Sequence, residues 1–238
     1  MLELNTFSIV ARCERSGELG VAVASAVPAV GSMCPYLVAG VGAVSTQSWV
    51  NPYLALGVLD ALREGTGAQQ ALSAVMATDS DAALRQIGVI GRAGPGVAWT
   101  GSNCTAWRGQ IVGADFAIQG NMLSGEATLQ AMHVAWQQDP AADLAERLMV
   151  VLEAGDAAGG DFRGKQSAAL KVVGEEAYAS VDLRVDEHVE PVTELRRVLG
   201  VARLQLLPFV GGMPRRQGVP RVLSEAVTGM LLRPPSQR

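Results

Sequence analysis

The first 25 residues consist of two apolar runs separated by a short polar turn. Residues 6–12 (TFSIVAR) and 18–25 (ELGVAVAS) are rich in β-branched and small apolar side chains, a composition that favours strands. The polar residues 15–17 between them predict a hairpin turn. The two-residue period of a strand places Thr6 and Ser8 on one face. We therefore expect an N-terminal β-hairpin whose first strand opens with a hydroxyl residue.

The rest of the chain alternates groups of strands with pairs of helices. Asn51 and Pro52 are typical of a helix start, and apolar residues at helical spacing continue to Gly65. Further helices are expected at 66–77, 125–136, 139–155 and 191–199, and further strands at 37–45, 87–90, 97–100, 111–112, 116–119, 168–173 and 179–185. Strands joined by tight turns, with helices in pairs, indicate an α+β fold with largely antiparallel sheets.

The composition changes after Gly200. Five prolines interrupt the remaining residues, and arginine outnumbers acidic residues there. This segment is also apolar, with Leu204, Leu206, Leu207, Phe209, Val222, Leu223, Met230, Leu231 and Leu232. We interpret residues 1–200 as one domain and 201–238 as an extension that packs on the domain or on a partner subunit. A homodimer or larger homo-oligomer is expected, because such apolar surface needs cover.

Composition and charge exclude several classes of protein. The chain has 238 residues, of which 49% are hydrophobic and 18% charged, which indicates a packed core rather than disorder. A net charge of −4 gives no reason to expect a nucleic-acid partner. No apolar run is long enough for a membrane span, and the first residues lack signal-peptide features. We therefore expect a cytoplasmic protein with no membrane partner.

The chain contains few cysteine and histidine residues. Cys13, Cys34 and Cys104 lack CxxC spacing, which argues against a zinc site or a disulfide framework. Because His133 and His188 are the only histidines, a three-histidine site is impossible within one chain. We expect no metal and no cofactor. Each cysteine is interpreted as a core residue, with Cys34 and Cys104 kept as alternative nucleophiles.

The loop at 159–167 (GGDFRGKQS) is the strongest candidate site on chemical grounds. Asp161 and Arg163 can bracket a polar ligand, and the glycines let backbone N–H groups approach a substrate. Gln166 and Ser167 add neutral donors at the start of the next strand. The alternative is a structural loop in which Asp161 and Arg163 pair with each other.

Two further polar positions follow predicted strands. Asn121 could donate to an oxyanion or be a turn residue, and Thr46 and Gln47 have the same two interpretations. In all, the expected substrate-binding residues are Ser8, Thr46, Gln47, Arg163, Gln166 and Ser167.

Seven segments occur in one order along the chain: TFSIVAR, GELGVAVAS, GVGAVSTQSWVNP, RQIGVI, QGNML, AGDAAGGDFRGKQSAAL and LRVD. Over about residues 5–200 the chain resembles a mainly bacterial family, domain of unknown function 1028. The resemblance implies the fold of the N-terminal nucleophile (Ntn) hydrolases, a four-layer αββα sandwich with two facing, largely antiparallel sheets. That fold agrees with the element order above.

The resemblance also implies a chemistry. Ntn hydrolases cut amide bonds with a Thr, Ser or Cys that opens the first strand, and Thr6 falls at that position. Asp161 and Ser167 fall loosely beside it. Proteasome-like members use a lysine after the hairpin, but no lysine here precedes Lys165, and Arg12 is a poor proton acceptor. The implied function is hydrolysis of a small amide or peptide-like C–N bond; the alternative is a non-catalytic binding or assembly protein.

Thr6 can act in two forms. If the Asn5–Thr6 bond is cut, the new α-amine can take the hydroxyl proton. Asp161 would then orient that amine, while Asn121 or the backbone near 46–47 holds the oxyanion. In the uncut chain Thr6 needs another acceptor, for which the sequence offers only Asp161. Ser8 is a further alternative nucleophile.

Overall fold

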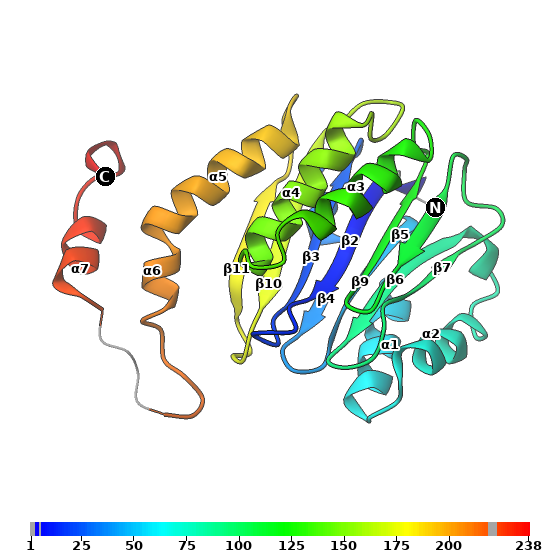
Figure 1. Ribbon diagram of the computed structural model, residues 1–238, viewed down its shortest axis with the longest axis horizontal. Helices are drawn as coiled ribbons and strands as arrows, with labels where there is room; N and C mark the ends of the chain where they lie inside the picture. Colours follow the sequence, from blue (N-terminus) through cyan, green and yellow to red (C-terminus); the bar gives the residue numbers. More distant parts are fainter. Residues whose placement is uncertain (1–2, 5, 219–222) are drawn as a thin grey trace.

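Two antiparallel β-sheets lie face to face in the computed structural model, which describes residues 3–4, 6–218 and 223–238 (Figure 1). One sheet contains β1 (Glu3–Leu4), β4 (Pro35–Val38), β5 (Gly42–Trp49), β6 (Arg85–Gly91) and β7 (Val97–Thr100). The other contains β2 (Thr6–Arg12), β3 (Leu19–Ser25), β8 (Gly109–Val112), β9 (Phe116–Asn121), β10 (Ser167–Val173) and β11 (Ala179–Val185). The six-stranded order β11-β10-β3-β2-β9-β8 places β2 in the middle of its sheet.

Helices cover the outer face of each sheet. The five-stranded sheet packs against α1 (Pro52–Arg63) and α2 (Ala68–Met76), and the six-stranded sheet against α3 (Ala127–Gln138), α4 (Leu144–Ala157) and α5 (Pro191–Gln205). The short α6 (Leu207–Val210) and α7 (Glu225–Leu231) follow. The α+β class and the four-layer αββα sandwich are confirmed, and this is the layering that the resemblance to Ntn hydrolases implies.

The two faces of β2 contact different layers of the sandwich. Phe7 and Ile9 belong to the hydrophobic core beneath α3 and α4. On the opposite face, Val10 packs between the sheets together with Ala43 and Ile90 of the other sheet. Because side chains alternate along a strand, Thr6 and Ser8 share this inter-sheet face. The strand therefore carries its hydroxyl groups into the interior of the sandwich.

Several predicted elements have other bounds in the structure, among them the helix expected at 139–155, which spans Leu144–Ala157. Two of the differences have a clear physical reason. The strand expected at 37–45 is a hairpin of β4 and β5, because Gly40 adopts a left-handed conformation with φ of 67° and turns the chain. The helix expected to end at Gly200 continues to Gln205. Burial of Leu199 and Ala202 on one face outweighs the cost of about 1 kcal/mol for a helical glycine.

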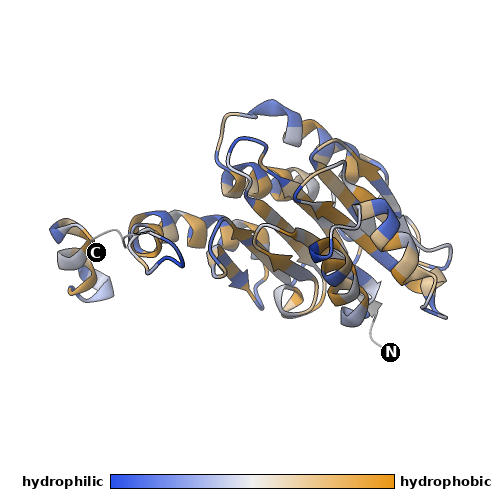
Figure 2. Cartoon of the chain, turned by 90° about the horizontal axis from the view of Figure 1, so that it is seen from below, coloured by the Kyte–Doolittle hydropathy of each residue, from blue (hydrophilic) through white to orange (hydrophobic). Residues whose placement is uncertain are grey.

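The chain beyond α5 first contacts the edge of the six-stranded sheet, where the Tyr178 hydroxyl donates to Pro214 O at 3.0 Å, and then leaves the sandwich. Figure 1 shows α6 and α7 beyond the six-stranded sheet, and Figure 2 shows the same separation from below, with α7 apart from the layers. Val222, one of the apolar residues expected to cover a partner, lies outside the described residues. No helix in the described part of the chain is long and apolar enough to cross a membrane.

Candidate active site

Thr6 opens β2 at the centre of the six-stranded sheet. It pairs with Ser25 of β3 on one side and with Asn121 of β9 on the other. The side chain is fully buried, and Thr6 Oγ1 donates a hydrogen bond to Ser25 Oγ at 3.3 Å. Directly opposed residues in adjacent strands have Cβ atoms about 5 Å apart on the same face. The Thr6 hydroxyl therefore lies between two polar side chains on the inter-sheet face.

The segment before Thr6 belongs to the opposite sheet. Strand β1 pairs antiparallel with the end of β5, with Glu3 opposite Trp49 and Leu4 opposite Ser48. The chain thus crosses from one sheet to the other immediately before Thr6. Asn5, whose bond to Thr6 is the expected cleavage point, lies outside the described residues.

A buried network of amides and hydroxyls links the two sheets beside Thr6. Ser8 Oγ donates to Gln47 Oε1 at 2.6 Å and accepts from Gln119 Nε2 at 2.7 Å. Gln47 Nε2 donates to the main-chain oxygen of Thr6 at 3.1 Å and to Gln86 Oε1 at 2.8 Å. All these side chains are fully buried. The network therefore holds the start of β2 against β5 and β6 through neutral hydrogen bonds.

Gln86 is the centre of this network. Its Nε2 donates to Gly120 O at 2.9 Å, to Gly109 O at 3.2 Å and to Thr100 Oγ1 at 3.0 Å. Its Oε1 accepts from Asn121 Nδ2 at 3.0 Å as well as from Gln47. The amino group of Asn121, which the sequence suggested as an oxyanion donor, therefore already has an acceptor.

The site contains no general base in its uncut form. Among the described residues, no carboxylate, imidazole or amine forms a hydrogen bond with the hydroxyl of Thr6 or Ser8. An amide oxygen such as Gln47 Oε1 accepts a hydrogen bond but is not a useful proton acceptor at neutral pH. Since a hydroxyl nucleophile needs a base, neither side chain is activated while residue 6 carries an ordinary amide nitrogen.

The loop expected to form the site passes across the start of β2. Asp161 forms a β-bridge with Leu123, just beyond the end of β9. At the other end of the loop, Gln166 N donates to Ser25 O at 2.8 Å, at the end of β3. Because β2 lies between β9 and β3, the two ends of the loop contact the strands on either side of β2.

Asp161 and Arg163 pair with each other within this loop. The Asp161 side chain is only 1% exposed, and its Oδ2 lies 3.2 Å from Arg163 Nη2. Its Oδ1 accepts from Arg163 N at 2.9 Å. No hydrogen bond between Asp161 and Thr6 is present in the described part of the chain. These contacts match the structural alternative for the loop.

We expect Asp161→Ala to lower the free energy of unfolding by about 2 kcal/mol, because hydrogen bonds to a charged group contribute about 1.5–3 kcal/mol each. Asp161→Asn keeps an acceptor for Arg163 N and should cost less. Chemical denaturation of both variants measures the difference. Unchanged stability together with lost activity would contradict a structural role and would assign Asp161 to substrate or amine binding.

The structure places other predicted residues outside the network. Thr46 lies on the opposite face of β5 from Gln47, on the side where Val44 packs beneath α1. Ser167 Oγ donates to Val27 O at 2.6 Å and accepts from Val30 N at 3.0 Å, so it holds a neighbouring turn.

Arg12, which was considered in place of the missing lysine, and Lys165 both have other partners. Lys165 Nζ binds Asp156 Oδ2 at 2.8 Å and Glu190 Oε2 at 2.6 Å. Arg12 lies at the opposite end of β2, six residues or roughly 20 Å from Thr6. Its side chain donates to the main-chain oxygens of Gly91 and Gly94. Neither side chain is placed to assist a reaction at Thr6.

The two alternative cysteine nucleophiles are buried. Complete burial raises the pKa of the Cys34 thiol far above its ordinary value, because the thiolate would be desolvated. Cys104 Sγ is directed to Arg85 O at 3.3 Å. A thiolate is the reactive form of cysteine, so Cys34 is a poor nucleophile in this structure.

Sequence reasoning missed two central residues, Gln86 and Gln119. Each is the single glutamine of a mostly apolar strand, in RQIGVI and AIQGN. A polar side chain in a buried strand needs a hydrogen-bond partner, and that signal could have found them. Gly88 leaves room for one of them, since a Cβ at Gly88 would lie 2.1 Å from Gln119 Oε1.

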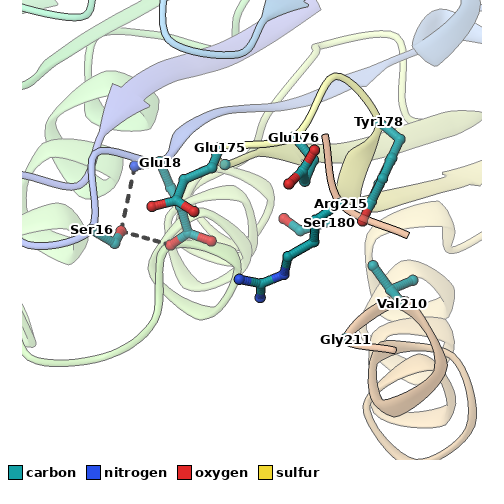
Figure 3. A pocket seen from close by; sticks show the side chains of 10 residues that line it. Ser16, Glu18, Glu175, Glu176, Tyr178, Ser180, Val210, Gly211 and Arg215 are labelled. Carbon is teal, nitrogen blue, oxygen red and sulfur yellow. Dashed lines mark hydrogen bonds between the residues drawn. The ribbon is translucent and has the colours of Figure 1, made fainter. Parts of the chain in front are cut away.

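A separate pocket of about 370 Å³ lies at the other end of the six-stranded sheet, beside the turn that follows β2 (Figure 3). Its lining includes Glu18, Glu175, Glu176, Tyr178 and Arg215, all of them exposed or half-buried. We place the candidate site at Thr6 instead, because the hydroxyl and amide groups around it are fully buried and form hydrogen bonds with one another. Within the described ranges, no group of three or more His, Cys, Asp or Glu side chains is placed to hold a metal ion.

Comparisons with known proteins bear on the chain as a whole. A crystal structure of a protein from Silicibacter pomeroyi, assigned to the DUF1028 family, is similar at 28% identity and a TM-score of 0.81, covering 89% of this chain and 95% of that one. Anbu proteins match more weakly. A variant from Hyphomicrobium sp. strain MC1 has 12% identity and a TM-score of 0.41 over 88% of this chain and 99% of its own. Anbu (ancestral beta-subunit) from Yersinia bercovieri has 10% identity and a TM-score of 0.37 over 89% and 100%.

The comparison with curated proteins gave no match. A family model, described as a family of unknown function (DUF1028), matches residues 6–195. The matched range begins at Thr6 and includes every strand except β1, the candidate network and the loop at 159–167. The chain therefore belongs to the DUF1028 family.

Proposed function

We propose that the protein is an amide-bond hydrolase of the Ntn type that becomes competent when the chain is cut before Thr6. One observation carries the proposal: the Thr6 hydroxyl lies in a buried site whose hydrogen-bonded side chains are all hydroxyls and amides. Such a hydroxyl has no base unless the residue provides its own. A new α-amine on Thr6, with an ordinary pKa near 7.7–8.0, is a suitable proton acceptor on the same residue.

In the proposed reaction Thr6 supplies both the base, its α-amine, and the nucleophile, its Oγ1. The α-amine takes the proton from Oγ1 while Oγ1 attacks the carbonyl carbon of a small amide or peptide-like substrate. The substrate C–N bond breaks, the leaving amine takes that proton, and an ester forms on Thr6. Water then attacks the ester, releases the acid and regenerates the hydroxyl. The hydrogen bond from Gln47 Nε2 to Thr6 O would hold the nucleophile in position throughout.

The second candidate function is a binding or assembly protein that never cuts itself. Two observations favour it. Thr6 is fully buried, and the segment before it is paired with β5 as strand β1. Both features hold the uncut chain in place and keep a substrate away from the hydroxyl.

Intact mass and turnover together distinguish the two functions. The full chain is aged and its mass followed for loss of residues 1–5. A second protein is produced with methionine directly before Thr6, which cellular methionine aminopeptidase removes. Both are assayed on simple amides, ureides and γ-glutamyl compounds. We expect turnover only from chains that begin at Thr6. Absence of turnover from a folded Thr6-first chain would favour the binding protein.

We further propose that the C-terminal extension joins copies of the chain. Residues 201–238 contain six arginines and one glutamate, so the extension carries +5 and residues 1–200 carry −9 of the total of −4. Leu204 and Leu232 are 72% and 82% exposed. A basic, apolar arm that extends from an acidic body (Figure 2) is complementary to the body of a second copy, where it would cover its apolar side chains.

Removing residues 201–238 or introducing Leu204→Glu with Leu232→Glu should lower the molecular mass measured by light scattering to that of a monomer. For the full-length double variant this is about 24.8 kDa. Tyr53→Glu is the matched control, because Tyr53 is 80% exposed on α1, away from the extension. A monomeric wild type, or an oligomer that both changes leave intact, would contradict the proposed assembly.

A further inference from the structure

The amide orientations in the buried network are set by main-chain carbonyl groups. Gly109 O and Gly120 O can only accept hydrogen bonds, so the group of Gln86 that faces them is Nε2. Gln86 Oε1 therefore faces Gln47 and Asn121, and both of these must turn their amino groups toward it. The hydrogen bond from Gln47 Nε2 to the carbonyl of Thr6 agrees independently with this orientation.

With the amides in this orientation, two acceptor atoms of the network receive no hydrogen bond. Asn121 Oδ1 and Gln119 Oε1 have no hydrogen-bond partner among the described residues, although both side chains are fully buried. A buried polar atom without a partner costs about 1–3 kcal/mol, and such an atom indicates a missing group. Here the missing group must be a hydrogen-bond donor, because both atoms are carbonyl oxygens.

Asn121 is also the direct neighbour of Thr6. The two residues are opposite each other in the register between β2 and β9, so their side chains leave the sheet on the same face. We propose that Asn121 is a positioning residue whose Oδ1 accepts a hydrogen bond from the α-ammonium group that cleavage creates on Thr6. This inference rests on the proposed function. It replaces the oxyanion role considered for Asn121, whose Nδ2 is already used by Gln86.

The other groups on the neighbouring elements are neutral or are paired with an opposite charge. Neighbouring strands contribute the neutral Ser25, Gln47 and Gln86. The charges in the adjacent loop, Asp161 and Arg163, form an ion pair with each other. On β6, Arg85 binds Asp79 and Asp81. An acceptor dipole at Asn121 stabilises the ammonium form, so it should raise the pKa of the Thr6 amine relative to a variant without it.

The test follows the Thr6 amine directly. In the chain that begins at Thr6, made with ¹⁵N-labelled threonine, only the Thr6 nitrogen titrates in NMR spectra, while the full-length chain is the control without a threonine amine. Asn121→Asp keeps an oxygen and adds negative charge, so we expect a higher pKa for the amine. Asn121→Ser removes the carbonyl oxygen and should lower it. Asn103→Asp, on an exposed loop, is the matched control for added charge and should shift the pKa little.

The pH dependence of turnover gives an independent measurement. Since the free amine is the base, a raised pKa moves the acidic limb of kcat/KM to higher pH, and a lowered pKa moves it to lower pH. If Asn121→Asp instead reduces turnover by about 10²–10³-fold, the loss typical of a missing oxyanion donor, and leaves the amine titration unchanged, the inference is overturned. Shifts in the titration without turnover from any chain would support the role of Asn121 and reject the hydrolase.

Discussion

Replacing Thr6 with alanine in the cut chain is expected to lower turnover of an amide substrate by at least about 10³-fold. Removing a catalytic hydroxyl nucleophile leaves only the residual catalysis that binding and electrostatic stabilisation provide. Thr6→Ser keeps the hydroxyl and the α-amine and should retain substantial turnover. Steady-state kinetics on the best substrate of the amide panel, with all chains beginning at residue 6, measures both effects.

Thr78→Ala is the control for this comparison, because Thr78 is exposed in the turn after α2. It should match the wild type. Thr6→Ala that hydrolyses the substrate as fast as the wild type would remove Thr6 from the mechanism. Ser8 would then be the remaining hydroxyl candidate. Of the two cysteines, Cys104 would be tested first, because burial raises the pKa of the Cys34 thiol.

Gln86→Leu is expected to lower the free energy of unfolding by roughly 3–5 kcal/mol. The variant removes the donor for Gly109 O and Gly120 O and the acceptor for Gln47 and Asn121. Each buried polar atom that loses its partner costs about 1–3 kcal/mol, and partial relaxation reduces the total. Urea denaturation monitored by tryptophan fluorescence measures the change.

Gln110→Leu is the matched control for this glutamine substitution. Gln110 lies on β8 and accepts from Thr100 Oγ1 at 2.7 Å, but it is exposed to solvent. Its groups can bind water when a partner is lost, so the expected change is within about 0.5 kcal/mol. Equal stability of Gln86→Leu and the wild type would mean that the network does not hold the sheets together.

Local patterns in the sequence were sufficient for most of the architecture. The strand period between residues 6 and 12 places Thr6 and Ser8 on one face, and the structure has them on the inter-sheet face. Asn51 caps α1 as expected, with its Oδ1 accepting from Tyr53 N at 3.2 Å. Such features depend on neighbouring residues alone, because backbone geometry and side-chain direction repeat over two to four residues.

The composition of the candidate site depended on the tertiary structure. Ser8 and Gln119 are 111 residues apart in the chain, yet they form a hydrogen bond of 2.7 Å. Their contact requires β2 and β9 to be adjacent, and the contact of Ser8 with Gln47 requires the second sheet to face the first. No periodic pattern within one strand encodes which polar residue of another strand it will meet.

Contacts between distant strands also explain why the roles of Asn121 and Gln47 differ from those expected. The sequence predicted Asn121 and Gln47 as polar groups that follow strands, whereas Gln47 lies within β5, which continues to Trp49. The direction of their amides could not be predicted from the sequence. That direction follows from Gly109 O and Gly120 O, which bind Gln86 Nε2 and so leave Asn121 to present an acceptor. The sequence by itself determined most of the strands and helices and the place of Thr6 at the start of a strand. Only the packing of the two sheets decided which neutral groups surround it, because hydrogen-bond direction depends on all the atoms that meet in the interior.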